Sequence, residues 1–316
     1  MAGTARSSLI GGRLPTLKDM STVDVRAEIR DFLSTRRARL TPAQAGLPAY
    51  GSNRRVKGLR REEVAMLAGV SVDYYVRMER GSLAGASESV LDALANALQL
   101  DEAERTHLFA LARESGPAGT RRRRPTPSTV RPAIQQVLDA MTDAPAWVRN
   151  GRHDIVAMNQ LARALYAPVL AQPRRPANTT RFVYLAPAAA EQFFVDYDRI
   201  AKDAAAMLRL EASRSPHDQA LIELVGELST RSERFRQEWA SHDVKFHRSG
   251  HKRLRHPVAG QLDLDFESME LAGEPGHYLN VYTAAAGTPT ADGLRLLASW
   301  AASENLPNET AASVKM

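Results

Sequence analysis

Residues 59–81 read LRREEVAMLAGVSVDYYVRMERG, and this stretch decides the fold of the N-terminal part of the chain. Two segments with helical spacing of apolar residues, 60–68 and 72–80, flank a short turn that contains Gly69. Glycine has no Cβ and therefore readily adopts the left-handed backbone that commonly ends a helix. The stretch predicts two helices joined by a tight turn, which is the arrangement of a helix-turn-helix motif.

The packing between these two predicted helices follows from the apolar residues within them. Ala65 is small enough to let the helices cross closely, and the residues spaced to face inward hold them at a fixed angle. The inward-facing residues are Val64, Leu67, Val70, Tyr75 and Met78. An ordinary amphipathic hairpin held by salt links is the alternative, and the turn, the small residue and the inward set together argue against it.

The second predicted helix begins with outward-facing residues that suit the major groove of DNA. A helix presented in this way brings its N-terminal side chains to the edges of the bases. The predicted base-contacting residues are Ser71, Val72, Asp73, Tyr74 and Arg77. Arg77 is the best donor to guanine, Asp73 can accept from the cytosine amino group, and Val72 can pack on a thymine methyl group.

Basic residues are concentrated just before this motif. Between Phe32 and Arg61 the chain has eight basic residues and no acidic one, and the formal charge of the whole chain is +6. Such a run usually forms a solvated face, but beside a recognition motif it predicts contacts to DNA phosphates. The predicted phosphate-contacting residues are Arg54, Arg55, Lys57, Arg60, Arg61 and Arg80.

The length of 316 residues and the changes in composition along the chain predict two domains. We expect a disordered tail at 1–20, an all-α helix-turn-helix domain at 21–114, a linker at 115–130, an α+β domain at 131–304 and a tail at 305–316. Further N-terminal helices are expected at 25–36, 87–98 and 101–112, the last two capped by Ser87 and Asp101.

After residue 131 the pattern changes from helices alone to helices and strands. Strands are expected at 146–148, 154–158, 245–251, 261–267 and 278–283. Helices are expected at 131–141, 160–166 and 290–302, with a helical block at 188–241 that is broken near Ser215-Pro216. Strands that flank a helical block predict the α+β class.

The motif resembles the Xre/Cro-type helix-turn-helix family, whose signature corresponds here to Ala65, to GVS at 69–71 and to ERG at 79–81. The longer stretch GLRREEVAMLAGVSVDYYVRMERG, with the basic loop SNRRVKGLRR before it, resembles the MmyB-like subgroup of these transcription regulators. The resemblance continues in APAWVRNGRHDIVAMNQLARAL, SGHKRLRHPVAGQLDLDF and LNVYTAAAGTPTADGLRLLASW, which are similar to the MmyB-like ligand-binding domain.

This resemblance implies a PAS-like C-terminal domain, in which a curved sheet packs with helices, and a small apolar ligand such as a fatty acid. Aromatic residues in the helical block are candidates for the pocket wall, although aromatic residues at helical spacing also suit an ordinary core. A pocket of this kind needs a few polar groups among apolar walls. The predicted pocket residues are Asn159, Phe182, Phe193, Phe194, Tyr197, Trp239 and His256.

Several classes of function are disfavoured by what the sequence lacks. It has no cysteine, no P-loop, no G-x-S-x-G and no H-E-x-x-H, so we expect neither an enzyme nor a cofactor. His242, His247, His251 and His256 invite a metal site, but the basic residues among them would repel a cation, and we expect no metal. No stretch is long and apolar enough to span a membrane, which favours the cytoplasm.

The sequence therefore predicts a cytoplasmic transcription regulator that binds double-stranded DNA as a homodimer and senses a small apolar molecule. One alternative is a DNA-binding protein whose C-terminal domain is a protein-interaction module without a small-molecule ligand. A second is a nucleoid protein that binds DNA through charge alone, which a steep salt dependence without sequence preference would reveal.

Overall fold

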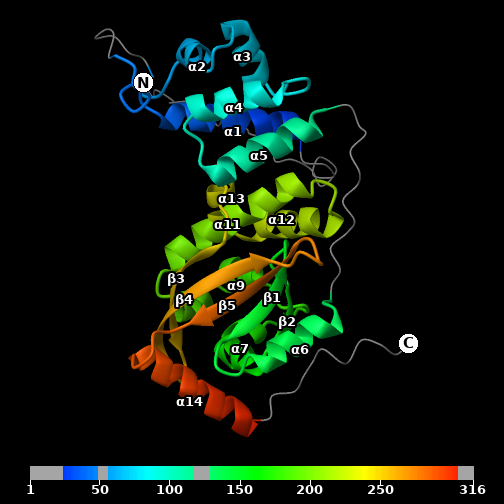
Figure 1. Cartoon of the computed structure of the whole chain (residues 1–316), viewed down its shortest axis with the longest axis vertical. Helices are drawn as coiled ribbons and strands as arrows, with labels where there is room; N and C mark the ends of the chain where they lie inside the picture. The colour runs from blue at the N-terminus through cyan, green and yellow to red at the C-terminus, as the bar shows by residue number, and fades with distance from the viewer. Residues whose placement is uncertain (1–23, 49–55, 117–128, 305–316) are drawn as a thin grey trace, which may run out of the picture.

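The computed structural model of the protein describes residues 24–48, 56–116 and 129–304. An all-helical N-terminal domain stands at one end of the long axis, and a layer of helices formed by residues 197–240 separates it from the sheet of the C-terminal domain (Figure 1). The predicted tails at 1–20 and 305–316 lie outside the described residues, as does most of the predicted linker.

Five helices form the N-terminal domain: α1 (Val25–Arg39), α2 (Arg61–Leu67), α3 (Val72–Glu79), α4 (Glu88–Ala97) and α5 (Glu102–Glu114). The side chains of Ser71, Ser87 and Asp101 cap α3, α4 and α5, each accepting a hydrogen bond from the backbone N–H three residues later. Gly69 has a φ of +64°, as the turn between α2 and α3 requires. The predicted helix-turn-helix arrangement is therefore confirmed.

The core of this domain gathers the inward-facing residues of α2 and α3 against α1, α4 and α5. Of the predicted inward set, Val64, Tyr75 and Met78 are buried, whereas Leu67 and Val70 are half-buried. Ala65 is also buried at the crossing of the two helices, as its size predicts. The residues that meet them from the other helices include Ile29, Phe32, Leu94 and Leu108.

The C-terminal domain contains five strands and nine helices within the described residues. The strands are β1 (Ala146–Asn150), β2 (Ile155–Met158), β3 (Ser249–His256), β4 (Gly260–Glu270) and β5 (His277–Thr283). The helices are α6 (Pro132–Ala140), α7 (Gln160–Leu165), α8 (Ala167–Leu170), α9 (Thr179–Leu185), α10 (Pro187–Phe193), α11 (Tyr197–Arg214), α12 (Gln219–Arg231), α13 (Glu233–Ala240) and α14 (Pro289–Glu304).

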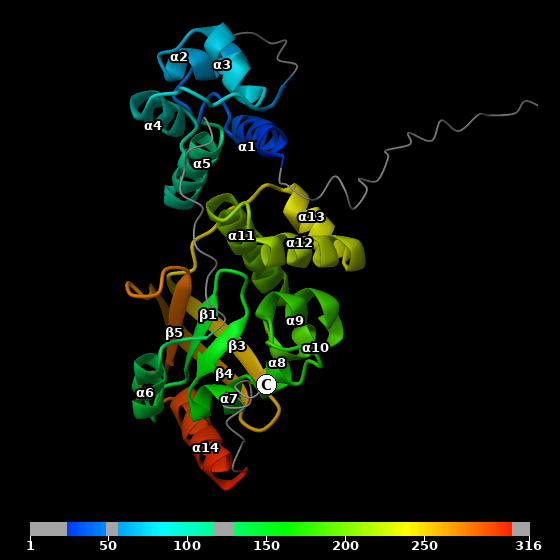
Figure 2. The same ribbon diagram turned by 90° about the vertical axis from the view of Figure 1, so that its right-hand side faces the viewer.

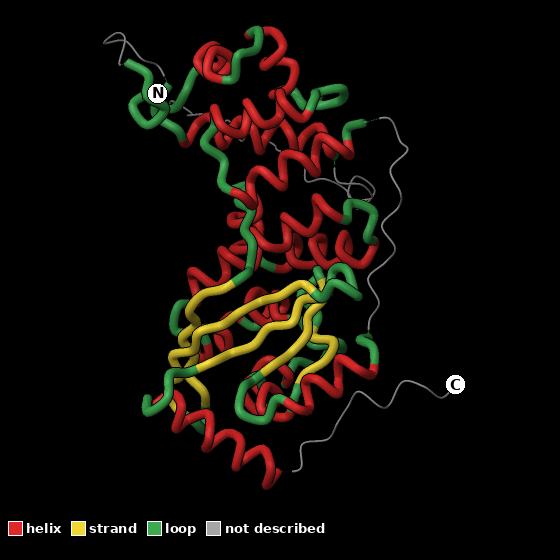
Figure 3. The backbone as a smooth tube through the Cα atoms, viewed as in Figure 1, coloured by secondary structure: helices red, strands yellow, loops and turns green. Residues whose placement is uncertain are grey.

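All five strands belong to one antiparallel sheet in the order β2-β1-β5-β4-β3 (Figure 3). In β4, Leu262, Leu264 and Phe266 are buried and alternate with exposed residues, as the sequence pattern predicts. These three residues point to the face that packs against α7, α9, α10, α11 and α14. Helix α6 covers part of the opposite face, and Figure 2 shows α6 and α10 on opposite sides of the sheet. This arrangement confirms the α+β class.

The structure corrects two features of the predicted elements. The strand expected at 245–251 lies at 249–256, because its register is set by pairing with β4, in which Ser249 faces Glu267 and His256 faces Gly260. The helical block expected at 188–241 is interrupted at two further places. Phe194 leaves the helix to bridge to Leu254 of β3, and Ser232 has an extended backbone from which it caps α13.

Asn159 holds together the start of α7 and the loop before β1. Its Oδ1 accepts from the N–H groups of Ala146 (3.1 Å) and Ala162 (2.8 Å). Its Nδ2 donates to the carbonyls of Met141 (2.6 Å) and Ala144 (2.7 Å). All the hydrogen-bonding positions of this buried side chain are therefore occupied by the backbone, and Asn159 has a structural role.

We predict that Asn159→Ala lowers the free energy of unfolding by about 3 kcal/mol, because it leaves buried backbone groups without partners. Urea unfolding followed by tryptophan fluorescence measures this, since Trp147, Trp239 and Trp300 all lie in the C-terminal domain. Thr230→Ala, at an exposed position of α12, is the matched control and should change the free energy by less than about 0.5 kcal/mol. Equal losses in the two variants would contradict the role given to Asn159.

Candidate DNA interface and ligand cavity

The recognition helix α3 projects from the end of the molecule that is farthest from the sheet (Figure 1). Among the predicted base-contacting residues, Ser71, Val72, Asp73 and Arg77 are exposed, and Tyr74 is half-buried. The guanidinium carbon of Arg77 lies 4.8 Å from the centroid of the Tyr74 ring, so these two side chains share one face of the helix. All five residues are therefore placed where DNA can reach them, and their individual base contacts stay predictions.

The predicted phosphate-contacting residues fall into two groups. Arg54 and Arg55 lie outside the described residues. The remaining four, which are all exposed, are Lys57, Arg60, Arg61 and Arg80. Their phosphate contacts also stay predictions, but Arg61 has a second role that the sequence analysis missed.

Glu79, the acidic residue of the ERG signature, is almost fully buried and is paired with two arginines. Its carboxylate accepts from Arg37 Nε at 2.8 Å and from Arg61 Nε. A buried carboxylate is costly unless it is paired, so these contacts tie α1 and α2 to the recognition helix. The hydrogen bond and charge of Glu79 raise the pKa of Arg61. The sequence indicates this burial by the position of Glu79, which lies one helical turn after the inward-facing Tyr75.

Gly81 brings the start of α1 against the end of α3. It has a φ of +100°, and a Cβ at this position would lie 2.5 Å from the carbonyl oxygen of Arg26. Because of this close approach, exposed Arg26 lines an open groove together with Arg77 and Arg80. Arg26 is therefore an additional candidate for a phosphate contact, and its position depends on packing between segments that are distant in the sequence.

The C-terminal domain contains a cavity between the sheet and α11. It has two adjoining lobes with volumes of about 100 and 360 Å³. The smaller lobe has apolar walls that include Trp147, Val183, Phe194 and Phe266. The larger lobe extends along α11 toward Glu211, Arg214 and Tyr278. The residues that line both lobes are Arg149, His153, Met207, Lys245, Phe246 and His247.

Arg149 of β1 is buried at the junction of the two lobes. Its guanidinium lies 4.4 Å over the ring of Tyr278, and its Nη1 donates to the carbonyl of Asn150 at 3.4 Å. Within the described ranges its Nε has no hydrogen-bond partner. Burial lowers the pKa of Arg149 against the opposing effects of Tyr278 and Glu211. A buried cation is costly unless it is fully paired, so the incomplete hydrogen bonding of Arg149 makes it a candidate to contact an anion, beside the charge of Glu211 that already acts on it.

Lys252 of β3 is a second buried cation on the cavity wall. Its Nζ donates to the hydroxyl of Tyr282 at 3.1 Å, and that hydroxyl is 2.6 Å from the hydroxyl of Tyr166. The ammonium group also lies 5.3 Å from the centroid of the Phe266 ring. Aromatic faces and a phenol stabilise a cation without neutralising it, so Lys252 adds to the positive potential of the cavity.

Two histidines beside these cations are held in their neutral form. Burial, together with the charges of Arg149 and Lys252, holds the pKa of His153 well below its usual range. Burial and the charges of Lys252 and Arg149 act in the same way on the pKa of His247. His153 Nδ1 is 2.6 Å from the Thr180 hydroxyl, which fixes the orientation of its ring. The cavity therefore combines apolar walls with cations and neutral histidines. Its lining also includes the carboxylates of Asp203, Glu211, Glu267 and Glu270.

The cavity is lined by a different set of residues from the one predicted from the sequence. Of that set, Phe194 lies on its wall. The others have structural positions. Asn159 caps α7, and Phe182 and Phe193 pack edge to face in the core. Tyr197 donates to the carbonyl of Val183, His256 contacts the carbonyl of Ala164, and Trp239 stacks under Arg209. Burial of aromatic surface in the core outweighed a pocket role for most of these side chains.

The histidines considered for a metal site lie apart from one another. His251 pairs with Asp265 at 3.1 Å, His247 stacks on Phe266 with 4.3 Å between ring centroids, and His256 contacts Ala164. Across the described residues, three or more histidine, aspartate or glutamate side chains do not converge as metal ligands would. The helices of the same residues also include none that is long and apolar enough to cross a membrane.

We predict that Arg77→Ala relaxes sequence preference at one base pair of the operator, at a cost of about 1–3 kcal/mol. Lys57→Ala, at an exposed site before the motif, should instead weaken binding to all sequences alike and lower the salt dependence. Selection from a random duplex library, followed by titration of single-base variants, measures both effects. A uniform loss in Arg77→Ala would exclude base reading by this residue.

Two family models match the chain, one for each domain. A helix-turn-helix domain matches residues 28–108. The MmyB-like transcription regulator ligand binding domain matches residues 130–297, which is more than half of the chain. No curated protein matches the chain significantly. Together with the helix-turn-helix and the α+β domain, these matches confirm the resemblance seen in the sequence. The chain belongs to the MmyB-like transcription regulators, with a DNA-binding helix-turn-helix domain followed by an MmyB-like ligand-binding domain.

Proposed function

We propose that this regulator acts in the cytoplasm as a homodimer on operator DNA, and that a fatty-acid-like molecule in the C-terminal cavity changes its affinity for DNA. The observation that carries the proposal is the pair of buried cations, Arg149 and Lys252, at an apolar cavity. A homodimer is proposed because two recognition helices in successive major grooves read a longer, pseudo-palindromic site than one helix does. Both matched families are regulatory rather than enzymatic.

The two parts of the cavity suit the two parts of an amphiphilic anion. The smaller lobe presents the apolar surfaces of Trp147, Phe194 and Phe266 to a hydrocarbon chain. Arg149 and Lys252 both line the smaller lobe, and we place the carboxylate of such a molecule beside them. A charge-assisted hydrogen bond in a buried site is stronger than a neutral one, so the head group dominates selectivity. A neutral molecule of the same length would leave the two cations as poorly solvated as before.

The test compares decanoate with decanol, which share an apolar chain and differ in charge. Isothermal titration calorimetry should show that decanoate binds the protein at least about tenfold more tightly, as expected for a charge-assisted hydrogen bond. Arg149→Met, which keeps an apolar stem, should weaken decanoate binding by about ten- to a hundredfold and leave decanol unchanged. Arg255→Met, at an exposed position of β3 outside the cavity, is the matched control.

Equal affinity for decanoate and decanol would contradict an anionic ligand. Absence of binding by both compounds, in a protein that retains operator binding, would instead favour a C-terminal domain that binds another protein. That outcome leaves the helix-turn-helix domain and its DNA target unaffected.

A further inference from the structure

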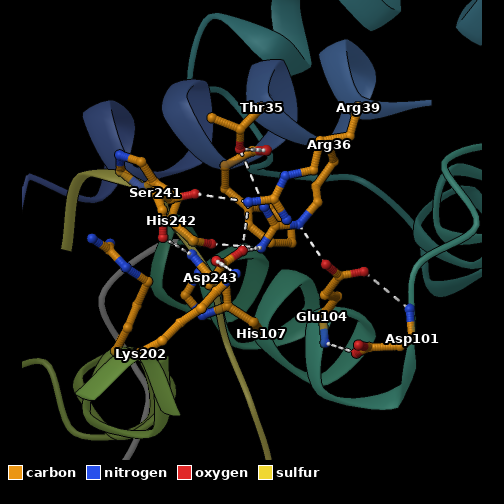
Figure 4. Close-up of polar contacts among 12 residues, drawn as sticks. Thr35, Arg36, Arg39, Asp101, Glu104, His107, Lys202, Ser241, His242 and Asp243 are labelled. Carbon is orange, nitrogen blue, oxygen red and sulfur yellow. Dashed lines mark hydrogen bonds and ion pairs between the residues drawn. The ribbon is translucent and has the colours of Figure 1, made fainter. Parts of the chain in front are cut away.

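One short segment, residues 241–248, touches both the helix-turn-helix domain and the ligand cavity. It connects the end of α13 to the start of β3, and residues 243–247 form an irregular connection between them. Figure 4 shows the first half of the segment, where Ser241, His242 and Asp243 face Arg36 and Arg39 of α1. The segment therefore lies in the path between the two parts of the protein.

The first half of the segment is held by arginines of α1. Asp243 accepts from Arg39 Nη2 at 2.5 Å and lies 3.8 Å from Arg36 Nη2 and 3.4 Å from Lys202 Nζ. The carbonyl of His242 accepts from Arg36 Nη2 at 2.5 Å. Arg36 is itself buried and is paired through Nε with Glu104 of α5 at 2.7 Å. Asp243 is thus connected to both α1 and α5.

The middle of the segment belongs to the core of the N-terminal domain. Val244 is buried in the same apolar cluster as Phe32 and Leu108, and Phe246 packs against the edge of that cluster. Leu210 of α11 is a further member of the cluster from the C-terminal domain. The helix-turn-helix domain is therefore docked through apolar surface as well as through ion pairs.

The second half of the segment forms part of the cavity wall. Lys245, Phe246 and His247 line both lobes. The next residue, Arg248, returns to the N-terminal domain and makes two bonds to the carboxylate of Glu102 at the start of α5, at 2.5 and 2.7 Å. Cavity contacts are thereby flanked on both sides, within five residues, by ion pairs to the helix-turn-helix domain.

A second contact between the domains is buried and comes from regular elements. Arg209 of α11 donates from Nη1 to both carboxylate oxygens of Glu28 in α1, each at 2.5 Å. The guanidinium stacks 4.1 Å over the ring of Trp239, and His107 and His242 lie 3.4 Å from Glu28. The pair of Arg209 and Glu28 joins the two domains without residues 243–248, although His242 also contacts Glu28.

We propose that residues 241–248 transmit ligand occupancy of the cavity to the helix-turn-helix domain, so that a ligand loosens its docking. This inference rests on the proposed function. An alkyl chain that passes from the small lobe of about 100 Å³ into the larger lobe runs against Lys245, Phe246 and His247, which line both lobes. The strands and α11 are fixed by backbone hydrogen bonds, whereas the irregular wall at 245–247 is fixed by its side chains. An outward shift of this wall pulls Asp243 from Arg39 and Arg248 from Glu102.

The ion pairs that flank the cavity wall, Arg39 with Asp243 and Arg248 with Glu102, are weak enough for ligand binding to break them. Arg39, Arg248 and Glu102 are about half exposed or more, so their ion pairs are weak and are screened by solvent. Ligand binding can therefore break them, whereas the buried contact of Glu28 with Arg209 persists. Couplings between sites in regulatory proteins are typically 5- to 150-fold in affinity, and we expect a value in this range for DNA binding in the presence of decanoate.

The experiment measures the distance between the domains directly. The chain has no cysteine, so Ser89→Cys in α4 and Glu223→Cys in α12, both exposed, can carry a donor and an acceptor dye. Decanoate should change the transfer efficiency in this labelled protein. Asp243→Asn should show the changed efficiency without decanoate, should still bind decanoate by calorimetry, and should lose most of the effect of decanoate on operator affinity.

Two variants serve as comparisons. Glu102→Gln removes the exposed end of the other ion pair and should act like Asp243→Asn, which covers the case in which Asp243→Asn fails to fold. Asp198→Asn removes an ion pair with Arg234 that lies within the C-terminal domain and is solvent-exposed, like the pair of Glu102 and Arg248. This variant should behave like the parent protein. Decanoate that binds without changing the transfer efficiency would overturn the coupling and leave the proposed function standing. Failure of decanoate to bind, seen by calorimetry, would overturn both.

Discussion

The ion pair between the mostly buried carboxylate of Glu28 and Arg209 is the interaction on which the arrangement of the two domains depends. Burial alone would raise its pKa, but the adjacent His107, the hydrogen bond with His242 and the charge of Arg209 hold the pKa of Glu28 well below its usual range. It is therefore ionised at neutral pH. Because Arg209 and His107 are also buried, loss of the carboxylate would leave a cation unpaired in the interior. The position of the helix-turn-helix domain is therefore set by charged residues that lie far apart in the sequence.

The protein treats buried charge in two ways. In the helix-turn-helix domain, Glu79 is satisfied by Arg37 and Arg61, and these pairs connect α3 to α1 and α2. In the cavity, Arg149 and Lys252 receive hydrogen-bonding or aromatic partners but no hydrogen-bonded carboxylate among the described residues. A fully paired charge stabilises the fold, whereas an incompletely paired one provides binding energy for a ligand of opposite charge. The helix-turn-helix domain shows the first case, and the ligand that we propose for the cavity would use the second.

The helix-turn-helix was predictable from the sequence because its determinants are local, as the turn at Gly69 and the cap at Ser71 show. The cavity was not, because its walls come from elements that are distant in the chain. The pairing of β3 with β4 places Lys252 on the inner face of the sheet. The strand predicted from the sequence ended at residue 251 and did not include Lys252. Asn159 and Trp239 have the chemistry of pocket residues, but Asn159 is hydrogen-bonded to backbone groups and Trp239 is stacked against Arg209.

If the cavity and the helix-turn-helix domain are thermodynamically coupled, the coupling is reciprocal. The most direct measurement is the affinity of the full chain for decanoate, by calorimetry, in the absence and in the presence of saturating operator duplex. Coupling predicts that the two affinities for decanoate differ, and by the same factor by which decanoate changes the affinity for the operator. Identical decanoate affinities in the two conditions would contradict it, because a ligand that does not distinguish the DNA-bound protein cannot regulate it.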